Sequence, residues 1–456
     1  MKQAIVLAGG KGTRLAQSLG QDIPKPMAPV CGIPLLERTL TSLREQSFCD
    51  VVLLVHHRSN VIRDHFGDGS SLGLRILYVE ESTPRGTGGA LFDALPVLEE
   101  RFAVLYGDTL VQFDLNKIWS FHTERDADFT LFAHPNDHPH DSDLLSCDSD
   151  GRVTRLMPYP HPEGSNFRNL VNAGLYMMNR NLLAALPSLG SGYDIAKHAL
   201  PFWISSGAKL FAYRGDGYIK DMGTPERLRK VECDLSNGTV ARKSGTVPRV
   251  AIFIDRDGTL NVPSGYLSKP NQMQLLPGVG AAIRSLNQLG ILAIVITNQP
   301  VIARGEASFE DLEAVHGRMD HLLAVEGAFL DSVFVCPHHP DSGFPGERPE
   351  LKTICRCRKP EPGLVEEALK RYSINLGESW FIGDTTTDIE CANRLGMRSI
   401  LVRSGFGGGD AKYTVEPTCI QPDLPAAISF IFDTFRLEPT ASIVTASTPA
   451  HHTDVN

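Results

Sequence analysis

The sequence lacks the features that direct a chain to a membrane or to nucleic acid. No apolar run approaches the length needed to cross a bilayer, and the apolar run within residues 1–10 is too short for a secretory signal peptide. The formal net charge is -9, which indicates no general affinity for nucleic acid or for an anionic membrane. We therefore expect a cytoplasmic protein with neither kind of partner.

The cysteines show no disulfide framework. There are nine, an odd number, and three of them crowd together with histidines between positions 336 and 357, which favours a metal site. Cys31, Cys49, Cys147 and Cys233 have no metal-ligand spacing, and we expect them to act as small packing residues.

The stretch from Ala251 to Leu260 organises the second half of the chain. Its first four residues are apolar and predict a short buried strand, which Asp255 and Asp257 follow. Unpaired carboxylates there are costly, and a bound divalent cation is the simplest reason for them. The alternatives are an ordinary turn at Gly258 or half of a calcium loop, although no glutamate completes the calcium pattern.

The first half opens with a glycine-rich loop after a predicted strand over residues 4–7. Gly9, Gly10 and Gly12 let the backbone approach a phosphate, and Lys11 and Arg14 add positive charge. The loop has neither the ending of a P-loop nor the spacing of a dinucleotide-binding loop. Taken alone it is a weak signal, which a tight turn also explains.

The specific signal comes from the segments that follow. They are a lysine between prolines at 24–26, a second glycine-rich loop at 83–90, an apolar strand ending in Asp108, and the runs 172–176 and 221–226. In this order they resemble the sugar-1-phosphate nucleotidylyltransferases over about residues 1–232. The resemblance implies a Rossmann-like α/β domain that joins a nucleoside triphosphate to a sugar 1-phosphate and releases pyrophosphate.

The resemblance also assigns residues. Two polyanions must meet in such a reaction, so cations must offset their repulsion. The assigned residues are Gly9, Gly10 and Arg14 for the triphosphate, Lys25 for the charge of the transition state, Gly86 and Gly88 in the loop that contacts the base, Asn172 for the sugar, and Asp108 and Asp221 for a catalytic magnesium.

One feature of that family is missing. Its members carry a Glu-Lys pair shortly before the Asn-Ala-Gly run, and residues 156–164 hold no such pair in place. The alternative is a first half that binds a sugar nucleotide without catalysis. The presence of Arg14, Lys25, Asp108 and Asp221 favours catalysis.

Strands and helices alternate after Asp257, and each strand ends in polar or acidic residues. This order predicts a parallel sheet whose carboxyl edge is an active site. Ser308 and Asp311 form a capping-box pattern at the start of one helix. We expect helices over residues 277–289, 308–326 and 362–371, and strands over residues 291–296, 332–335 and 380–382.

The polar residues at these strand ends match a four-part signature. Asp255 with Asp257, then Thr297, then Lys359, then Asp384 with Asp388, resembles the haloacid dehalogenase superfamily of phosphatases. The roles that this implies are Asp255 as the nucleophile that becomes an aspartyl phosphate, Asp257 as the acid that protonates the leaving oxygen and then activates water, Thr297 and Lys359 as ligands of the phosphoryl oxygens, and Asp255, Asp384 and the backbone carbonyl of Asp257 as magnesium ligands.

A cysteine- and histidine-rich stretch precedes the lysine of that signature. Cys336, Cys355 and Cys357 with one histidine suit a closed tetrahedral zinc site, with His338 or His339 as the fourth ligand. The pattern resembles the D-glycero-D-manno-heptose 1,7-bisphosphate phosphatases and the related histidinol-phosphate phosphatases over about residues 250–408. This resemblance favours His338, and it adds Arg358 and Asn298 as candidate substrate-binding residues.

These patterns predict an α/β protein of two domains. The 456 residues hold 42% hydrophobic and 21% charged residues, which is enough apolar material for two full cores. We expect a Rossmann-like nucleotidyltransferase domain over 1–233, a linker over 234–249, a haloacid dehalogenase-like doubly wound parallel sheet with a zinc loop over 250–432, and a disordered tail over 433–456.

The combined prediction is a bifunctional enzyme of nucleotide-activated heptose synthesis. One half removes the 7-phosphate of a heptose 1,7-bisphosphate, and the other transfers a nucleotidyl group, expected from GTP, to the heptose 1-phosphate. The expected cofactors are Mg²⁺ in both domains and structural Zn²⁺. The alternative is a histidinol-phosphate phosphatase fused to a hexose 1-phosphate nucleotidyltransferase. Whether the chain forms a homo-oligomer stays open.

Overall fold

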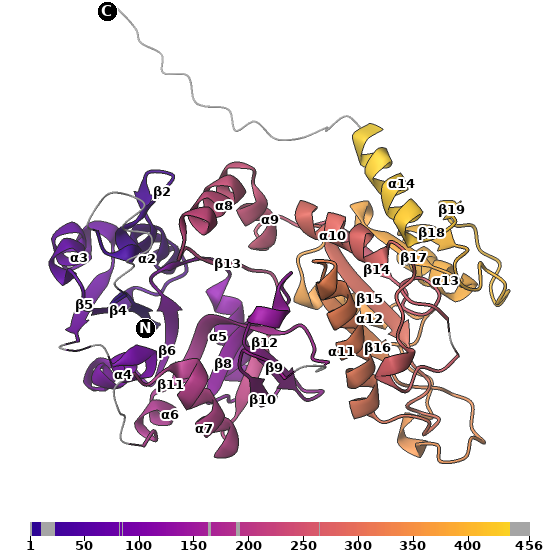
Figure 1. The fold of residues 1–456 in the computed structure, drawn as a ribbon, viewed down its shortest axis with the longest axis horizontal. Helices are drawn as coiled ribbons and strands as arrows, with labels where there is room; N and C mark the ends of the chain where they lie inside the picture. The colour runs from indigo at the N-terminus through magenta and orange to yellow at the C-terminus, as the bar shows by residue number, and fades with distance from the viewer. Residues whose placement is uncertain are drawn as a thin grey trace, which may run out of the picture.

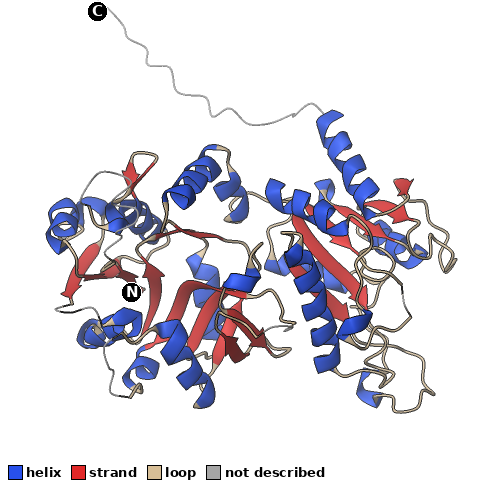
Figure 2. Ribbon diagram, viewed as in Figure 1, coloured by secondary structure: helices blue, strands red, loops and turns tan. Residues whose placement is uncertain are grey.

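The computed structural model describes residues 2–10, 23–81, 83, 85–162, 166–187, 192–263 and 265–437. Arg14 and residues 438–456 of the predicted tail lie outside this set. The chain forms two α/β domains side by side, the first from indigo to magenta and the second from orange to yellow in Figure 1. Figure 2 shows strands flanked by helices in both domains. No helix in the described ranges is long and apolar enough to cross a membrane.

The first domain is built on a nine-stranded mixed sheet of order β10-β9-β11-β6-β1-β4-β5, in which β8 joins β11 and β12. Strands β5, β4, β1 and β6 run parallel, and β11 lies antiparallel to β6. Its sheet strands are β1 Gln3–Leu7, β4 Asp50–Val55, β5 Arg75–Glu80, β6 Arg101–Tyr106, β8 Phe129–His134, β9 Leu144–Cys147, β10 Val153–Met157, β11 Val171–Asn179 and β12 Leu210–Tyr213.

Two smaller ribbons and the helices complete this domain. Strand β2 (Pro29–Val30) pairs with β3 (Ile33–Pro34), and β7 (Thr109–Gln112) pairs with β13 (Tyr218–Asp221). The α-helices are α2 Leu35–Glu45, α3 Ser59–Phe66, α4 Gly86–Asp93, α5 Leu115–Glu124, α6 Arg180–Ala184, α7 Leu200–Ser205, α8 Pro225–Ser236 and α9 Thr239–Lys243.

Alternating apolar residues in the central strands explain why helices cover both faces of this sheet. In β1, Ile5 packs with Leu91 of α4 on one face, while Ala4 and Val6 pack with Leu40 of α2 on the other. All of these side chains are buried. Successive residues of a strand point to opposite faces, so an apolar strand is fully buried only when both faces are covered.

Half of the predicted linker over residues 234–249 is helical in the structure. Helix α8 continues to Ser236, and helix α9 occupies Thr239–Lys243. Val240 of α9 packs in a buried cluster with Tyr218 and Leu228, so this segment belongs to the first domain. A single apolar residue among polar neighbours gives no helical period to detect, and the tertiary contact decides the structure.

The second domain is a six-stranded parallel sheet of order β16-β15-β14-β17-β18-β19. Helices α10, α11 and α14 cover one face, and α12 and α13 cover the other. The strands are β14 Ala251–Ile254, β15 Leu292–Asn298, β16 Ser332–Cys336, β17 Trp380–Gly383, β18 Arg398–Val402 and β19 Cys419–Gln421, and the helices are α10 Val279–Leu289, α11 Phe309–Val325, α12 Gly363–Arg371, α13 Thr386–Arg394 and α14 Leu424–Leu437.

Two boundary predictions for this domain can be compared with the structure. The capping box at the start of α11 is confirmed, because the Ser308 side chain accepts from the Asp311 N–H and the Asp311 carboxylate accepts from the Ser308 N–H. The boundary of the predicted tail was wrong, since α14 extends through residues 433–437. The apolar face of α14 packs on β18 and β14. The polar residues that follow the helix in the sequence give no sign of this contact.

Buried polar contacts join the two domains at the amino edge of the second sheet. Asp216, between β12 and β13, accepts from Arg249 Nη2 at 2.5 Å and from the backbone N–H of Ser373 at 2.5 Å. Only 4% of the Asp216 side chain and 7% of the Arg249 side chain are exposed. Because Arg249 precedes β14, the catalytic edge predicted for this sheet lies at the opposite end of its strands.

Candidate active sites

The carboxyl ends of β14, β15 and β17 bring the predicted phosphatase residues together. Asp255 follows β14 and is 7% exposed. The Lys359 ammonium contacts the Asp255 carboxylate and lies 2.7 Å from Asp388 Oδ1. Burial disfavours the charged ammonium, but Asp255 and Asp388 outweigh it and raise the pKa of Lys359. Lys359 is therefore a fixed cation beside the candidate nucleophile.

Three buried carboxylates share this pocket. Ligand oxygens of Asp255, Asp384 and Asp388 lie within 4.8 Å of one another. Burial raises the pKa of Asp384 to about 7, and it raises the pKa of Asp255 well above its usual value. Asp384 Oδ1 is buried and accepts no hydrogen bond from any described group. One lysine does not balance three carboxylates, so this donor set fits a divalent cation with oxygen ligands.

Asp388 was named in the sequence motif, but it was given no ligand role. Its Oδ2 accepts from Thr385 Oγ1 at 2.6 Å as part of a capping box at the start of α13. A capping pattern alone explains such a residue, and only the fold shows that its other oxygen reaches Lys359.

The Asp257 carboxylate lies outside the metal cluster and is held by neighbouring side chains. Arg256 Nη2 donates to it at 2.7 Å, Gln299 Nε2 at 2.8 Å, and Asn261 Nδ2 at 3.1 Å. Burial raises the pKa of Asp257, but the Arg256 guanidinium outweighs this and holds it below its usual value. This arrangement agrees with a metal role limited to the backbone carbonyl of Asp257, as the motif implied.

Thr297 and Asn298 end β15 beside this pocket. Gln299 Nε2 donates to Thr297 Oγ1 at 2.8 Å, which orients the hydroxyl. Asn298 binds the backbone of Lys359 twice, because its Oδ1 accepts from the Lys359 N–H at 3.0 Å and its Nδ2 donates to the Lys359 carbonyl at 3.1 Å. Asn298 therefore positions the lysine, which the sequence motif did not predict.

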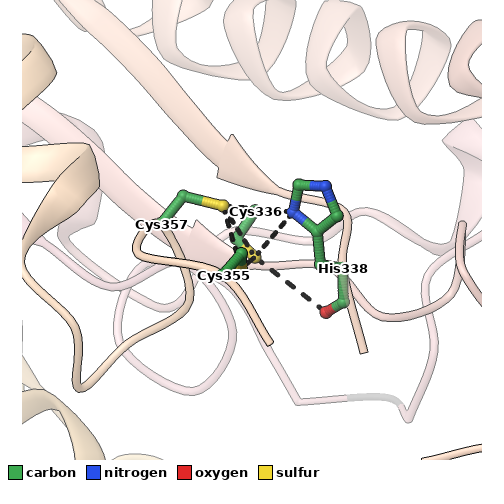
Figure 3. A group of neighbouring side chains, drawn as sticks. All are labelled: Cys336, His338, Cys355 and Cys357. Atoms are coloured by element: carbon green, nitrogen blue, oxygen red, sulfur yellow. Dashed lines mark hydrogen bonds between the residues drawn. The ribbon is translucent and has the colours of Figure 1, made fainter. Parts of the chain in front are cut away.

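The predicted zinc ligands converge on one point, as Figure 3 shows. The Cys357 sulfur lies 3.3 Å from the sulfur of Cys336, 3.2 Å from that of Cys355 and 3.1 Å from His338 Nδ1. All three cysteines are free thiols. Hydrogen bonding to Cys336, together with burial, raises the pKa of the Cys357 thiol, so a cation is needed to hold these sulfurs as thiolates. The donor set fits zinc.

The structure decides between the two candidate histidines. His338 lies in the sulfur cluster, whereas His339 Nε2 lies 3.2 Å from Arg304 Nη2 and His339 packs edge-on against Phe344. Arg358 Nη1 donates to the His338 carbonyl at 3.2 Å. The cluster therefore fixes the loop that carries Arg358 and Lys359 toward the phosphatase pocket.

A cavity of about 320 Å³ lies over the carboxyl ends of β1 and β6 in the first domain. Its lining includes Gly9, Gly10, Gly86, Lys25 and Asp108, all of which the sequence assigned to the nucleotide or to catalysis. Thr87, Glu81 and Tyr106 line the same cavity, although no motif singled them out. Gly88 lies beside this cavity, where its N–H donates to the Tyr193 carbonyl at 2.9 Å.

Gly86 and Gly88 have a packing requirement of their own. Gly86 has a φ of +82°, and a Cβ there would lie 2.5 Å from the Tyr193 carbonyl oxygen. A Cβ on Gly88 would lie 2.8 Å from the Tyr193 ring. These two glycines therefore let the start of α4 approach the segment around Tyr193, whether or not the same loop contacts a base.

The two candidate magnesium aspartates of the first domain lie on paired strands. Asp108 precedes β7, and Asp221 pairs with Thr109 across the ribbon. The Lys25 ammonium contacts Asp108, and Arg227 Nη1 donates to Asp221 at 2.6 Å. Each carboxylate thus already has a cation partner, and both offer the oxygen ligands that Mg²⁺ prefers.

A second cavity, of about 650 Å³, adjoins the Asp221 side of this site. Asn172 and Asp221 of the first domain line it together with Arg284, Asn287 and Gln288 of the second. Lys220 and Lys243 also line it, and no described carboxylate forms an ion pair with either lysine. The cavity therefore combines a predicted sugar contact with unpaired cations, and the second domain closes one side of it.

Comparison with known proteins identifies both halves. A family described as nucleotidyl transferase matches residues 3–238, and a family described as HAD-hydrolase-like matches residues 356–427. The chain belongs to the nucleotidyl transferase family. Over 192 residues it is also 37% identical to a D-glycero-D-manno-heptose-1,7-bisphosphate 7-phosphatase of Thermosynechococcus vestitus, covering 41% of this chain and 96% of the relative.

Two further relatives match one domain each. A D-glycero-beta-D-manno-heptose-1,7-bisphosphate 7-phosphatase of Yersinia pestis is 38% identical over 156 residues, 34% of this chain and 81% of the relative. A mannose-1-phosphate guanylyltransferase of Mycobacterium tuberculosis is 33% identical over 237 residues, 52% of this chain and 65% of the relative. The second half thus belongs to the family of these 7-phosphatases. The protein is an enzyme with a nucleotidyltransferase domain and a haloacid dehalogenase-like phosphatase domain.

Proposed function

We propose that the enzyme performs two consecutive reactions on one sugar. The phosphatase domain removes the 7-phosphate from D-glycero-D-manno-heptose 1,7-bisphosphate, and the nucleotidyltransferase domain joins the resulting heptose 1-phosphate to a nucleotide. The observation that carries this proposal is the fusion of two domains whose relatives are a heptose bisphosphate phosphatase and a sugar-1-phosphate guanylyltransferase. The product of the first reaction is a substrate of the second.

In the phosphatase reaction, a carboxylate oxygen of Asp255 forms a bond to phosphorus as the bond to the sugar oxygen breaks. Asp257 gives its proton to that leaving oxygen. A water then attacks the phosphorus of the aspartyl phosphate, Asp257 takes its proton, and Asp255 is regenerated with release of phosphate. The charge of a bound phosphate favours the protonated form of Asp257 in the first step, and Arg256 favours its ionised form in the second.

The other residues of this site bind and orient. Lys359 and Thr297 donate to phosphoryl oxygens, while Asn298 fixes the backbone of Lys359. Asp255, Asp384 and Asp388 offer the oxygens for Mg²⁺, with the backbone carbonyl of Asp257 as a further ligand. When bound, the metal neutralises charge between nucleophile and phosphate. Cys336, His338, Cys355 and Cys357 would hold Zn²⁺, which would fix the loop of Arg358 when bound. Arg358 is placed to meet a distal phosphate or a sugar hydroxyl.

In the nucleotidyltransferase reaction, a phosphate oxygen of the sugar 1-phosphate attacks the α-phosphorus of the triphosphate and pyrophosphate leaves. Gly9, Gly10 and Arg14 bind the triphosphate, and Lys25 neutralises charge that develops in the transition state. Asp108 and Asp221 hold Mg²⁺, which offsets the repulsion between the two phosphates when bound. Asn172 and the cavity of about 650 Å³ receive the sugar phosphate.

GTP is the proposed nucleotide, since the relative of this domain is named as a guanylyltransferase. Both anomers of the heptose are open to test, because the phosphatase relatives carry names with and without the beta designation. Cations that line the sugar-side cavity, Lys220 among them, are proposed to take the place of the missing Glu-Lys pair.

The intact chain tests the proposal in a substrate panel. Phosphate release is measured from the α- and β-anomers of heptose 1,7-bisphosphate and from histidinol phosphate, and pyrophosphate release from GTP, ATP and CTP with each heptose 1-phosphate. We expect fastest hydrolysis of one heptose bisphosphate and fastest transfer from GTP to the same anomer. Faster turnover of histidinol phosphate, or transfer that Asp108→Ala does not abolish, contradicts the proposal.

A further inference from the structure

The first domain contacts helix α11 of the second domain. Arg168, just before β11, donates to Glu313 of α11 at 2.8 Å and 3.0 Å through Nη1 and to Asp320 at 2.8 Å through Nε. The backbone N–H of Asn169 donates to the same Asp320 oxygen at 2.9 Å. Gly317, between these two acids, permits the approach, because a Cβ there would lie 3.0 Å from the Asn166 carbonyl oxygen.

A buried histidine continues this contact into the second domain. His316 is fully buried, and its Nδ1 lies 4.0 Å from Glu313 Oε1. On the other side of the ring, Arg256 Nη1 lies 3.1 Å from His316 Nε2. Because a guanidinium has donors only, Nε2 is the acceptor and the ring proton sits on Nδ1, on the side of Glu313. His316 Nδ1 is buried and has no hydrogen-bond partner among the described residues, so Glu313 acts on it through charge rather than through a hydrogen bond. The negative charge of Glu313 favours the tautomer that Arg256 requires.

Arg256 contacts both His316 and Asp257, the proposed proton donor. It is fully buried, and its Nη2 donates to Asp257 at 2.7 Å and to Gln299 Oε1 at 2.9 Å. Gln299 in turn donates to Asp257 at 2.8 Å and to Thr297 at 2.8 Å. One guanidinium plane therefore sets the orientation of Asp257 directly and through Gln299.

We propose that the contacts Arg168–Glu313–His316–Arg256 let the nucleotidyltransferase domain hold Asp257 in the orientation that protonates the leaving sugar oxygen. Arg168, Glu313, His316 and Arg256 are positioning residues in this scheme. The physical reason is that a proton donor must lie within hydrogen-bond reach of its acceptor, and a misplacement of about 1 Å costs up to a hundredfold in rate. The inference rests on the proposed role of Asp257.

The test compares two phosphate esters that differ in their need for a proton. A sugar alkoxide must be protonated as it leaves, whereas 4-nitrophenolate leaves without help. We expect Arg168→Met to lower kcat/KM for heptose 1,7-bisphosphate about tenfold and kcat/KM for 4-nitrophenyl phosphate less than twofold, as a partial loss of general-acid catalysis requires. The quantity is kcat/KM because it reports the step in which the leaving group departs and does not include breakdown of the aspartyl phosphate, in which Asp257 acts as the base for both esters. We also expect Gly317→Ala, which removes no polar group, to lower the ratio of kcat/KM for heptose 1,7-bisphosphate to that for 4-nitrophenyl phosphate.

The histidine gives a paired comparison inside the second domain. His316→Leu removes the acceptor for Arg256 and lowers the ratio of the two kcat/KM values, while His316→Gln keeps an acceptor oxygen and restores it. Arg229→Met is the control, because Arg229 lies on α8 with 72% of its side chain exposed and outside these contacts. Thermal unfolding of each variant shows that the fold is kept.

The outcomes distinguish the proposed role of Asp257 as proton donor from the proposed role of the contacts between the domains. If Asp257→Asn leaves the ratio unchanged, the proposed role of Asp257 fails, and this inference falls with it. If Asp257→Asn lowers the ratio but folded Arg168→Met and His316→Leu lower kcat/KM for both esters equally or not at all, only the inference is overturned.

Discussion

At the residue scale, the phosphatase site depends on a lysine among three buried carboxylates. Lys359 contacts Asp255 and Asp388 and also donates to the Ile296 carbonyl at 2.8 Å. These contacts leave the ammonium little freedom, so it is in place before a phosphate binds. Preorganised charge of this kind contributes more to a transition state than charge that must reorient.

The first prediction concerns the nucleophile. Asp255→Asn keeps the shape of the side chain but removes the attacking oxygen anion, so we expect phosphate release to fall at least about a thousandfold. Pyrophosphate release by the other domain should remain within twofold of the wild type, which serves as the control on the same preparation. Hydrolysis that survives this change would mean that water attacks the phosphorus directly.

The second prediction concerns Lys25, whose side chain is 13% exposed in the nucleotide cavity. Lys25→Met removes the cation beside Asp108, and we expect nucleotidyl transfer to fall by about a hundredfold or more. The KM for GTP should change much less than kcat if the charge acts in the transition state. A rise in KM with kcat intact would make Lys25 a ground-state binding residue. Phosphate release is the matched control.

Local motifs predicted the candidate nucleophile, the candidate zinc ligands and the lysines, since each lies within a short run of characteristic spacing, and the fold brings the cysteines and His338 together. They did not identify Arg256 or His316 as members of one site. Arg256 contacts a histidine 60 positions later in the chain, and an arginine next to an aspartate carries no sign that it is buried. Such pairings depend on the fold rather than on spacing.

At the element scale, the predictable parts are those whose sequence carries a strong period or cap. Strands β1, β14 and β15 each contain an uninterrupted run of at least four apolar residues, and α11 has its capping box. Helix α9 is short and polar, and it forms because Val240 packs on α8. The helical structure of this connector therefore depends on a tertiary contact, whereas sequence periodicity predicts a linker here.

The third prediction concerns the loop that the cysteines hold. Cys357→Ser removes one of four ligands, so we expect zinc content, measured on purified protein, to fall from one ion per chain toward none. Lys359 follows two residues later, so phosphate release should fall as the loop loosens. Cys419→Ser is the control, because this half-buried cysteine lies outside the cluster. Wild-type protein without zinc would contradict the site itself.

At the scale of the whole molecule, the second domain contributes part of the lining of the cavity proposed to receive the sugar phosphate. Arg284, in the middle of α10, lines the cavity of about 650 Å³ and donates to the Glu326 carbonyl at 2.8 Å. The position of this guanidinium could not be predicted from either half alone, because it depends on how the two domains dock.

The fourth prediction follows from that position. Arg284→Gln removes a cation from the cavity, and we expect KM for the sugar 1-phosphate to rise about tenfold, the cost of losing one charged hydrogen bond. KM for GTP and phosphate release should stay within twofold. Lys370→Gln on α12, an exposed lysine outside the cavity, is the control. An unchanged KM would mean that the sugar phosphate does not reach the second domain.

The last prediction concerns transfer of the intermediate between the two sites. The cavity and the Arg249–Asp216 contact lie at the amino edge of the phosphatase sheet, whereas Asp255 lies at its carboxyl edge. Six residues of extended chain separate Arg249 from Asp255, a distance of about 20 Å through a packed domain. If the two proposed reactions are consecutive, we expect heptose 1-phosphate to leave one site and diffuse to the other. In a coupled assay with labelled bisphosphate, added unlabelled heptose 1-phosphate should dilute the label in the nucleotide sugar in full proportion, and label that resists dilution would show direct transfer.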